Sequence, residues 1–178
     1  MKPELVQSKT IYRGKVFDVR QDQVRLPNGK IMQLDIINHP VAVVLVPVDS
    51  SGNIWLIRQY RHSAGEEILE LPAGVTEANE TVEESARREL REEIGMQANS
   101  VRLIGEFYIA PGYTTEYLYI YLATDLSPAP LPGDEDEFIE VVPTPITEAF
   151  ALVQNGQIRD AKTLAALLLA TPYLLPTA

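Results

Sequence analysis

The chain has 178 residues, of which 46% are hydrophobic, and carries a formal net charge of −10 at pH 7. This length and composition favour one folded domain with at most a small appendage, and they exclude an intrinsically disordered chain. The acidic charge argues against a general nucleic-acid binder, which needs basic side chains to neutralise phosphates. The chain has no cysteine, so disulfides and thiolate metal sites are excluded.

The sequence also argues against a membrane protein. No apolar run reaches the roughly 20 residues that span a bilayer. The opening MKPELVQSKTIYRGK lacks the apolar segment of a secretory signal. We therefore expect no membrane partner and a cytoplasmic location.

Three strand-like segments at the start of the chain predict a small antiparallel β unit. They cover residues 9–14, 16–30 and 31–40, and Asn28-Gly29 is a typical hairpin signal. We expect residues 1–38 to form this unit and residues 39–178 to form the main domain.

The main domain is predicted to combine strands with a few helices. Residues 41–49, VAVVLVPVD, form a continuous apolar run with many β-branched side chains, which is typical of a strand buried on both faces. Further strands are expected at residues 54–61, 66–74, 101–112, 116–126 and 138–145, and helices at residues 146–158 and 160–174. This order indicates an α+β fold with a mixed β-sheet.

The segment SARRELREEIG, residues 85–95, predicts a short amphipathic helix. Thr81 followed by Glu84 is a capping-box signature for its start, and Gly95 is well placed to end it. Apolar residues recur at helical spacing and should face the sheet: Val82, Ala86, Leu90 and Ile94.

The charged residues of this helix fall into two groups. Two glutamate–arginine pairs have the (i, i+4) order that stabilises a solvated face: Glu83–Arg87 and Glu84–Arg88. A second group, Glu89, Glu92 and Glu93, flanks the apolar stripe instead. Half-buried carboxylates so close together repel one another unless a cation lies between them. A Mg²⁺ site fits this group, and a solvated acidic face is the alternative.

The pattern extends upstream of the helix into a longer motif. Gly74, five residues, Glu80, seven residues and then RELREEIGM reproduce every fixed position of the Nudix box. The sequence therefore resembles the Nudix hydrolases. The resemblance implies the Nudix α/β/α sandwich with a mixed β-sheet, and an enzyme that hydrolyses nucleoside diphosphate compounds with divalent cations.

Carried over position by position, the resemblance implies a metal site. Glu89, Glu93 and the backbone carbonyl of Ala73 are the implied ligands of Mg²⁺, for which Mn²⁺ is a possible substitute. Glu92 and Glu80 are implied as supporting carboxylates, and Arg88 as the partner of a box glutamate. We expect Gly74 to be required for its backbone geometry.

Outside the box, the chain is most similar to ADP-ribose pyrophosphatases and related nucleoside diphosphate sugar hydrolases. The segments ELPAG, APG and GDEDEFIEV carry this similarity. In such enzymes a glutamate of the acidic loop serves as the base or as an extra metal ligand, which implies Glu137 or Glu135. The box residue Glu92 is the third implied catalytic carboxylate. Which of the two loop glutamates is the base stays open, as does the alternative of a solvated loop.

The same similarity implies a set of substrate-binding residues. They are Arg58, Arg61, Glu70, Pro111, Gly112 and Glu116. The arginines would contact the diphosphate or the terminal ribose, the two carboxylates the sugar hydroxyls, and the Pro-Gly turn would border the substrate. Surface salt bridges and an ordinary turn are the alternative readings.

These residues together predict Mg²⁺-dependent hydrolysis of ADP-ribose, or a related nucleoside diphosphate sugar, to a nucleoside monophosphate and a sugar phosphate. GDP-mannose or a dinucleoside polyphosphate is an alternative substrate, and a non-catalytic ADP-ribose sensor is an alternative function. The resemblance also implies a homodimer built by the N-terminal unit. Whether that unit is exchanged between subunits, the preferred base and sugar, and the number of metal ions are left open.

Overall fold

The structure is a computed structural model of the chain, and it describes residues 2–133 and 137–175. The chain forms two compact units. The first contains Met1–Val41 and Phe107–Leu118, and the second contains Ala42–Glu106 and Tyr119–Ala178. No helix in the described ranges is both long enough and apolar enough to span a membrane.

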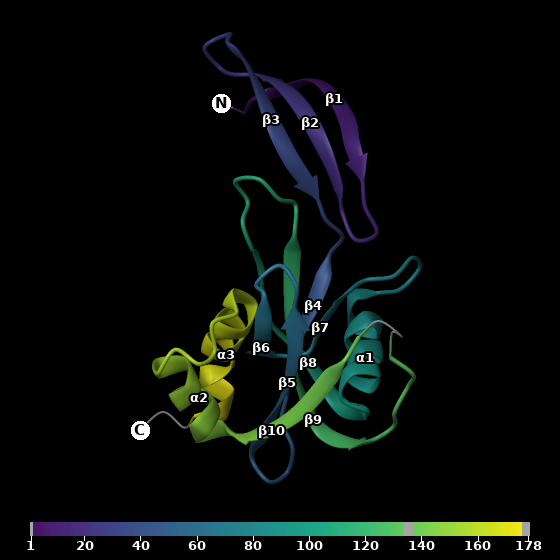
Figure 1. Cartoon of the computed structure of the whole chain (residues 1–178), viewed down its shortest axis with the longest axis vertical. Coiled ribbons are helices and arrows are strands. Elements are labelled where there is room, and N and C mark those ends of the chain that lie inside the picture. Colours follow the sequence, from purple (N-terminus) through teal and green to yellow (C-terminus); the bar gives the residue numbers. More distant parts are fainter. Residues whose placement is uncertain (1, 134–136, 176–178) are drawn as a thin grey trace. The chain divides into compact units, whose positions relative to one another are not determined.

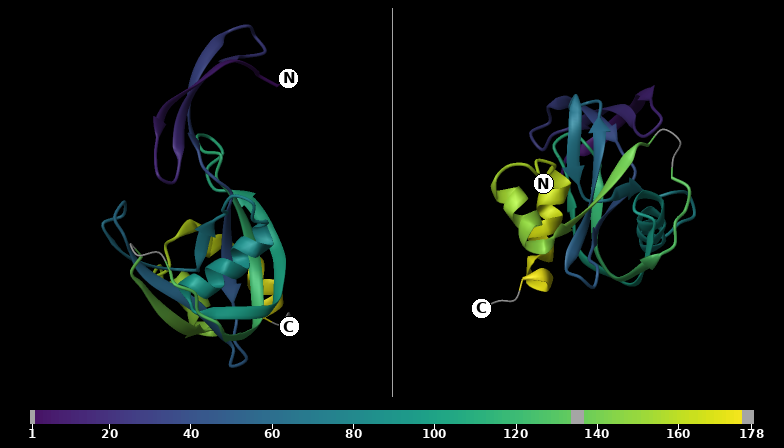
Figure 2. Two further views of the ribbon diagram at one scale, coloured as in Figure 1. Left: turned by 90° about the vertical axis from the view of Figure 1, so that its right-hand side faces the viewer. Right: turned by 60° about the horizontal axis from the view of Figure 1, so that its bottom comes forward.

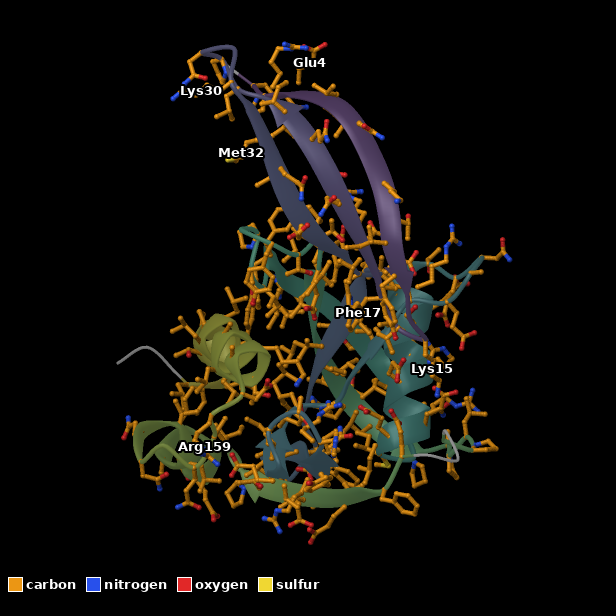
Figure 3. The ribbon with its side chains drawn as sticks, turned by 45° about the horizontal axis from the view of Figure 1, so that its top comes forward. Glu4, Lys15, Phe17, Lys30, Met32 and Arg159 are labelled. Carbon is orange, nitrogen blue, oxygen red and sulfur yellow. The ribbon has the colours of Figure 1, made fainter. Side chains whose placement is uncertain are left out.

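The first unit is built around an antiparallel sheet of three strands, in the order β1-β2-β3 (Figure 1). The strands are β1 (Glu4–Arg13), β2 (Asp18–Arg25) and β3 (Ile31–Asn38). The predicted hairpin turn is confirmed, since Gly29 has a φ of 82° and its N–H donates to the Leu26 carbonyl at 2.9 Å. Glu4, Lys30 and Met32 lie near this turn, whereas Lys15 and Phe17 lie at the opposite end of the sheet (Figure 3).

Strand β1 begins at Glu4, earlier than the predicted start at residue 9. Its pairing with β2 continues until Glu4 is opposite Arg25. All residues of β1 are exposed, so the strand has no alternation of buried and exposed positions. Pairing with a neighbouring strand therefore extends β1 where the sequence pattern gives no signal.

The second unit places two sheets between its helices (Figures 1 and 2). The strand orders are β7-β4-β9-β8 and β10-β5-β6. The strands are β4 (Ala42–Pro47), β5 (Asn53–Arg61), β6 (Glu66–Glu70), β7 (Ala73–Val75), β8 (Met96–Tyr108), β9 (Tyr117–Pro128) and β10 (Ile139–Pro145). The helices are α1 (Val82–Glu93), α2 (Ile146–Gln154) and α3 (Ala161–Leu174). Helix α1 lies on one side and helices α2 and α3 on the other, which confirms the predicted α/β/α sandwich.

The core of this unit forms around β4. Every residue of β4 is buried, as its apolar run predicts. Helix α1 packs its apolar stripe against this core, with Ala86 and Leu90 fully buried and Ile94 almost so. Each large apolar side chain buried in this way stabilises the fold by about 1.5–3 kcal/mol. Because α1 packs on β4 in this way, the position of the charged face of α1 is fixed.

The start of α1 has the predicted capping box. Glu84 N–H donates to Thr81 Oγ1 at 3.2 Å, and Thr81 N–H donates to Glu84 Oε2 at 2.8 Å. Because the cap uses the Glu84 carboxylate, the predicted Glu84–Arg88 pair is wrong. The predicted pair of Glu83 and Arg87 is confirmed at 2.8 Å.

Candidate active site

An acidic cavity of about 150 Å³ lies between α1 and the segment around β7. Four glutamates and one arginine contribute to its wall. The lining residues are Ala73, Gly74, Val75, Glu77, Arg88, Glu89, Glu92 and Glu137. The cavity therefore gathers the box residues Glu89 and Glu92 and one residue of the acidic loop, Glu137.

Strand β7 brings the backbone of Ala73 and Gly74 to this cavity. It pairs antiparallel with the buried strand β4, so that Gly74 is opposite Val43 and Ala73 opposite Val44. A Cβ atom at Gly74 would lie only 2.0 Å from Oε1 of Glu89. The φ of Gly74 is not in the left-handed region, so the expectation of a special backbone geometry is wrong. A side chain at position 74 would instead displace the Glu89 carboxylate, which approaches the backbone closely.

Glu89 and Glu93 are the two buried carboxylates of α1, with exposures of 8% and 7%. Glu89 accepts a hydrogen bond from Arg88 at 2.7 Å, and Oε2 of Glu93 accepts one from the Ala73 N–H at 2.8 Å. Burial raises the pKa of Glu89 to about 7. Burial and the negative charge of Glu89 raise the pKa of Glu93 well above its ordinary value. The protein thus supplies too little positive charge for both groups.

Arg88 is shared among several oxygens. It donates to Glu80 at 3.0 Å, to Glu92 at 2.8 Å and to the Val75 carbonyl at 3.0 Å, in addition to its bond with Glu89. The hydrogen bond from Arg88 lowers the pKa of Glu80 to about 2. Glu80 is therefore well satisfied, whereas a single guanidinium cannot neutralise all its carboxylate partners.

The donor set around the cavity fits a hard divalent cation. Magnesium prefers oxygen ligands, and carboxylates and a backbone carbonyl are present at Glu89, Glu92, Glu93 and Ala73. Within residues 2–133 and 137–175, no three side chains of the types that bind metals are already spaced to hold one ion together. Arg88 donates to Oε1 of Glu89, so a cation would compete with Arg88 for that oxygen.

The structure brings two of the three predicted catalytic carboxylates to this cavity. Glu92 lines it while accepting a hydrogen bond from Arg88. Glu137 reaches it from the loop before β10, and its charge contributes to the raised pKa values of Glu89 and Glu93. Glu135 lies outside the described residues.

The two arginines predicted to bind substrate do not lie together. They are three residues apart on β5, so their side chains leave opposite faces of the strand. Arg58 forms an exposed ion pair with Glu140 of β10 at 3.0 Å. Arg61 donates from Nε to Oε1 of Glu70 at 2.7 Å, and Glu70 is only 1% exposed.

The remaining predicted substrate residues belong to the first unit: Pro111, Gly112 and Glu116. A turn begins at Ala110, whose carbonyl accepts hydrogen bonds from the N–H groups of Tyr113 and Thr114, both at 3.1 Å. The Glu116 carbonyl accepts a hydrogen bond from Ile109 N–H at 3.3 Å, which closes the loop.

Sequence reasoning missed the contacts of Lys162 with Glu70 and with Asp160, the latter at 2.8 Å. Lys162 and Glu70 are 92 residues apart, so no local pattern connects them. The available signal was the single lysine within the otherwise apolar start of a helix, AKTLAALLLA. Such a charge needs a partner when its helix packs on a sheet.

Comparison with known proteins agrees with this geometry. A family model described as NUDIX domain matches residues 38–167, and one described as nucleoside diphosphate sugar hydrolase N-terminal domain matches residues 4–31. The ADP-ribose pyrophosphatase of Bacillus subtilis (strain 168) is 37% identical over 165 residues, which cover 92% of this chain and 89% of that protein.

Two further relatives extend the similarity over almost the whole chain. The ADP-ribose pyrophosphatase of Mycobacterium tuberculosis (strain ATCC 25618 / H37Rv) is 38% identical over 168 residues, which cover 93% of this chain and 81% of that protein. The crystal structure of an ADP compounds hydrolase is similar with a TM-score of 0.88 and 29% identity, over 98% of this chain and 95% of that one. The chain therefore belongs to the Nudix family and is a Nudix hydrolase of the nucleoside diphosphate sugar hydrolase type.

Proposed function

We propose that this Nudix hydrolase cleaves the diphosphate bond of ADP-ribose, or of a related nucleoside diphosphate sugar, and gives a nucleoside monophosphate and a sugar phosphate. The observation that carries the proposal is the excess of buried carboxylate over cation around Arg88, at the cavity beside α1. Two relatives named ADP-ribose pyrophosphatases support this choice of substrate.

Residues in and beside the cavity would bind Mg²⁺. Glu89, Glu93 and the Ala73 carbonyl are the proposed ligands, Glu92 is a further oxygen donor, and Mn²⁺ is a possible substitute. When bound, Mg²⁺ neutralises phosphoryl oxygens and lowers the pKa of the attacking water. Gly74 supports this arrangement because it leaves room for the Glu89 carboxylate beside the backbone.

A carboxylate must also remove the proton of the attacking water. We assign this role to Glu137, because it lines the same cavity as Glu89 and Glu92. Glu135, from the same loop, is the second candidate. Arg88 holds the Glu92 carboxylate at 2.8 Å, and this fixed position suits Glu92 to orient the water.

Arg61 is the proposed partner of the substrate diphosphate. Only its Nε is engaged, by Glu70, and its terminal nitrogens have no hydrogen-bond partner in the described part of the chain. A guanidinium with free terminal nitrogens binds phosphoryl oxygens with two parallel hydrogen bonds. Arg58 is a weaker candidate because Glu140 already pairs with it.

The Pro-Gly loop of the first unit is the proposed contact of the sugar. Pro111 and Gly112 would border the substrate, and Glu116 would accept a hydrogen bond from a sugar hydroxyl. The proposal is supported by the turn in this loop, in which the N–H groups of Tyr113 and Thr114 donate to the Ala110 carbonyl and hold the backbone in a defined shape.

We also propose that the protein acts in the cytoplasm as a homodimer formed through its first unit. The three-stranded sheet leaves many large apolar side chains exposed: Leu5, Val6, Ile11, Tyr12, Val16, Phe17, Ile31 and Met32. A large exposed apolar surface of this kind is typical of a protein–protein interface. Light scattering after size exclusion, with and without residues 1–38, measures the proposed dimer.

The direct test of the activity is hydrolysis of ADP-ribose in the presence of Mg²⁺, with EDTA as the control. Chromatography of the products should detect a nucleoside monophosphate and a sugar phosphate. A panel with GDP-mannose and a dinucleoside polyphosphate measures the preference for base and leaving group. Binding of ADP-ribose without hydrolysis of any panel compound would instead identify a sensor.

A further inference from the structure

A chain of charged contacts connects the start of α3 with Arg61. Lys162 Nζ contacts Oε2 of Glu70, and the other Glu70 oxygen accepts the hydrogen bond from Arg61 Nε at 2.7 Å. Glu70 is 1% exposed, so its carboxylate is almost completely removed from water. Glu70 therefore lies between two cations and uses one oxygen for each.

The fold holds this contact chain in place through the first turn of α3. Asp160 caps the helix by accepting a hydrogen bond from Thr163 N–H at 3.0 Å, and it pairs with Lys162 at 2.8 Å. Thr163 is fully buried and its hydroxyl accepts a hydrogen bond from Leu71 N–H at 2.9 Å. Because Leu71 directly follows Glu70, this bond fixes the helix start beside the Glu70 backbone.

Burial makes both cations necessary to Glu70. A buried carboxylate is costly unless its oxygens are paired with positive charge and hydrogen-bond donors. The side chain of Lys162 is 16% exposed, whereas that of Arg61 is 39% exposed. Lys162 is thus the inner anchor, and Arg61 is the member of the pair that reaches solvent.

The position of Arg61 also relates this contact chain to the acidic cavity. Burial works to lower the pKa of Arg61, but the hydrogen bond to Glu70 and the charge of Glu93 contribute to raising it. Glu70, the hydrogen-bond partner of Arg61, is only three residues before Ala73, whose N–H donates to Glu93 at 2.8 Å. The anchor of Arg61 therefore lies close along the chain to the backbone that contacts the proposed metal ligand Glu93.

We propose that Lys162 is a positioning residue for the hydrolysis, which acts through Glu70 to hold the Arg61 guanidinium toward the substrate diphosphate. This inference rests on the proposed function. It also gives Glu70 a role different from the predicted contact with a sugar hydroxyl, because both of its oxygens are used within the protein.

The neighbouring pair of Arg159 and Glu66 provides a matched control. Arg159 lies in the loop before α3 (Figure 3), and the exposures of the two side chains are 61% and 46%. Exposed ion pairs contribute little to stability. Arg159→Met removes one cation near the same helix start and leaves the Lys162–Glu70–Arg61 contacts intact.

The test is a double-mutant cycle on kcat and KM for ADP-ribose with saturating Mg²⁺. Lys162→Met should lower kcat/KM by about 10- to 100-fold, the effect expected when a substrate-binding group is displaced. Arg159→Met should change it by less than about 2-fold. In the Arg61→Ala background, Lys162→Met should change kcat/KM by less than about 3-fold, because residues that act through one another are not additive.

Two further readings distinguish positioning from loss of structure. The loss of kcat/KM should be divided between kcat and KM in the same way for Lys162→Met as for Arg61→Ala. Lys162→Arg keeps a cation at Glu70 and should therefore retain more activity than Lys162→Met. Thermal unfolding verifies that each variant is folded, and Lys162→Gln carries the same test if the methionine variant does not fold.

The outcomes separate the two proposals. An active wild-type protein in which Lys162→Met has no effect, or has the same effect with and without Arg61, would overturn the positioning role alone. A wild-type protein that hydrolyses no nucleoside diphosphate compound would overturn the proposed function, and the positioning role with it.

Discussion

The acidic cavity beside α1 and the ion-pair network at the start of α3 differ in the balance between carboxylates and cations. The network matches two carboxylates with two cations: Glu70 and Asp160 with Arg61 and Lys162. At the cavity, Arg88 is the one cation among the described residues that pairs with Glu80, Glu89 and Glu92, and Glu93 accepts a hydrogen bond from a backbone N–H.

The pKa values follow this difference. Burial works to raise the pKa of Asp160, but the charge of Lys162 brings it below its ordinary value. At Glu89 and Glu93, burial prevails and both pKa values are raised. In the network, cations of the protein neutralise the carboxylates. In the cavity, the excess of negative charge suits the cluster to bind an added cation.

The largest expected effect comes from neutralising one carboxylate in each region. Glu93→Gln should lower kcat/KM by about 10²- to 10³-fold, the range for losing one group that stabilises developing charge. In metal-free protein at pH 8 it should raise the free energy of unfolding, because it removes a buried, unbalanced charge. Denaturant titration measures the second effect.

Glu70→Gln is the matched variant in the network. It leaves Lys162 and Arg61 without their shared anion, so the free energy of unfolding should fall by about 1–3 kcal/mol. The two regions therefore differ in the sign of the change: the free energy of unfolding should rise for Glu93→Gln and fall for Glu70→Gln. Equal losses of stability would contradict the assignment of unbalanced charge to the cavity.

The second effect uses the close approach of Glu89 to the backbone. Gly74→Ala should lower kcat/KM by about 10- to 100-fold, because its Cβ displaces the Glu89 carboxylate. Gly105→Ala is the control, since its Cβ would lie 2.6 Å from Leu169 Cδ1. Both changes displace the end of a side chain and not the backbone, so both should cost little stability, and only the first should reduce activity.

The third effect is a pH dependence of stabilisation by Mg²⁺. Folded protein without metal keeps the proton of Glu89 up to about pH 7, whereas the unfolded chain releases it near 4.5. The stability from this group is therefore fully present below pH 4.5 and is lost as the pH rises toward 7.

Magnesium binds the ionised carboxylates, so it should restore stability mainly at high pH. Differential scanning calorimetry at pH 5.5 and pH 8 should show the larger rise in Tm at pH 8, and a smaller rise at pH 8 for Glu93→Gln. A rise of the same size at both values of pH would contradict binding at Glu89.

The smallest effect is expected at Arg58. Its ion pair with Glu140 is exposed, at 41% and 63% of the two side chains. Arg58→Met should change the free energy of unfolding by less than about 0.5 kcal/mol and kcat/KM by less than about 2-fold. A loss comparable to that of Arg61→Ala would show that the exposed face of β5 also serves the reaction.

Sequence reasoning succeeded where the signal is local and periodic. The apolar run of β4, the stripe of α1 and the capping box at Thr81 each depend on residues within a few positions of one another. The Nudix box is likewise contiguous, so the position of its carboxylates on α1 could be predicted.

Sequence reasoning failed where two partners compete or lie far apart. Glu84 has the right spacing for Arg88, but the helix cap at Thr81 takes its carboxylate. The anchoring of Glu70 by Lys162 requires α3 to pack beside β6, which no local pattern reveals. Sequence similarity favours Arg61 over Arg58 as the substrate contact, but it does not reveal that the two arginines have different partners on the two faces of β5.

The hydrogen bond from the Ala73 amide to Glu93, at 2.8 Å, gives the site a built-in spectroscopic reporter. The chemical shift of this amide proton depends on the charge and orientation of the carboxylate that accepts it. Because β7 is fixed by pairing with β4, the amide itself stays in place while the carboxylate changes. A single ¹⁵N-labelled alanine resonance would therefore follow the arrival of each ligand without any modification of the cavity.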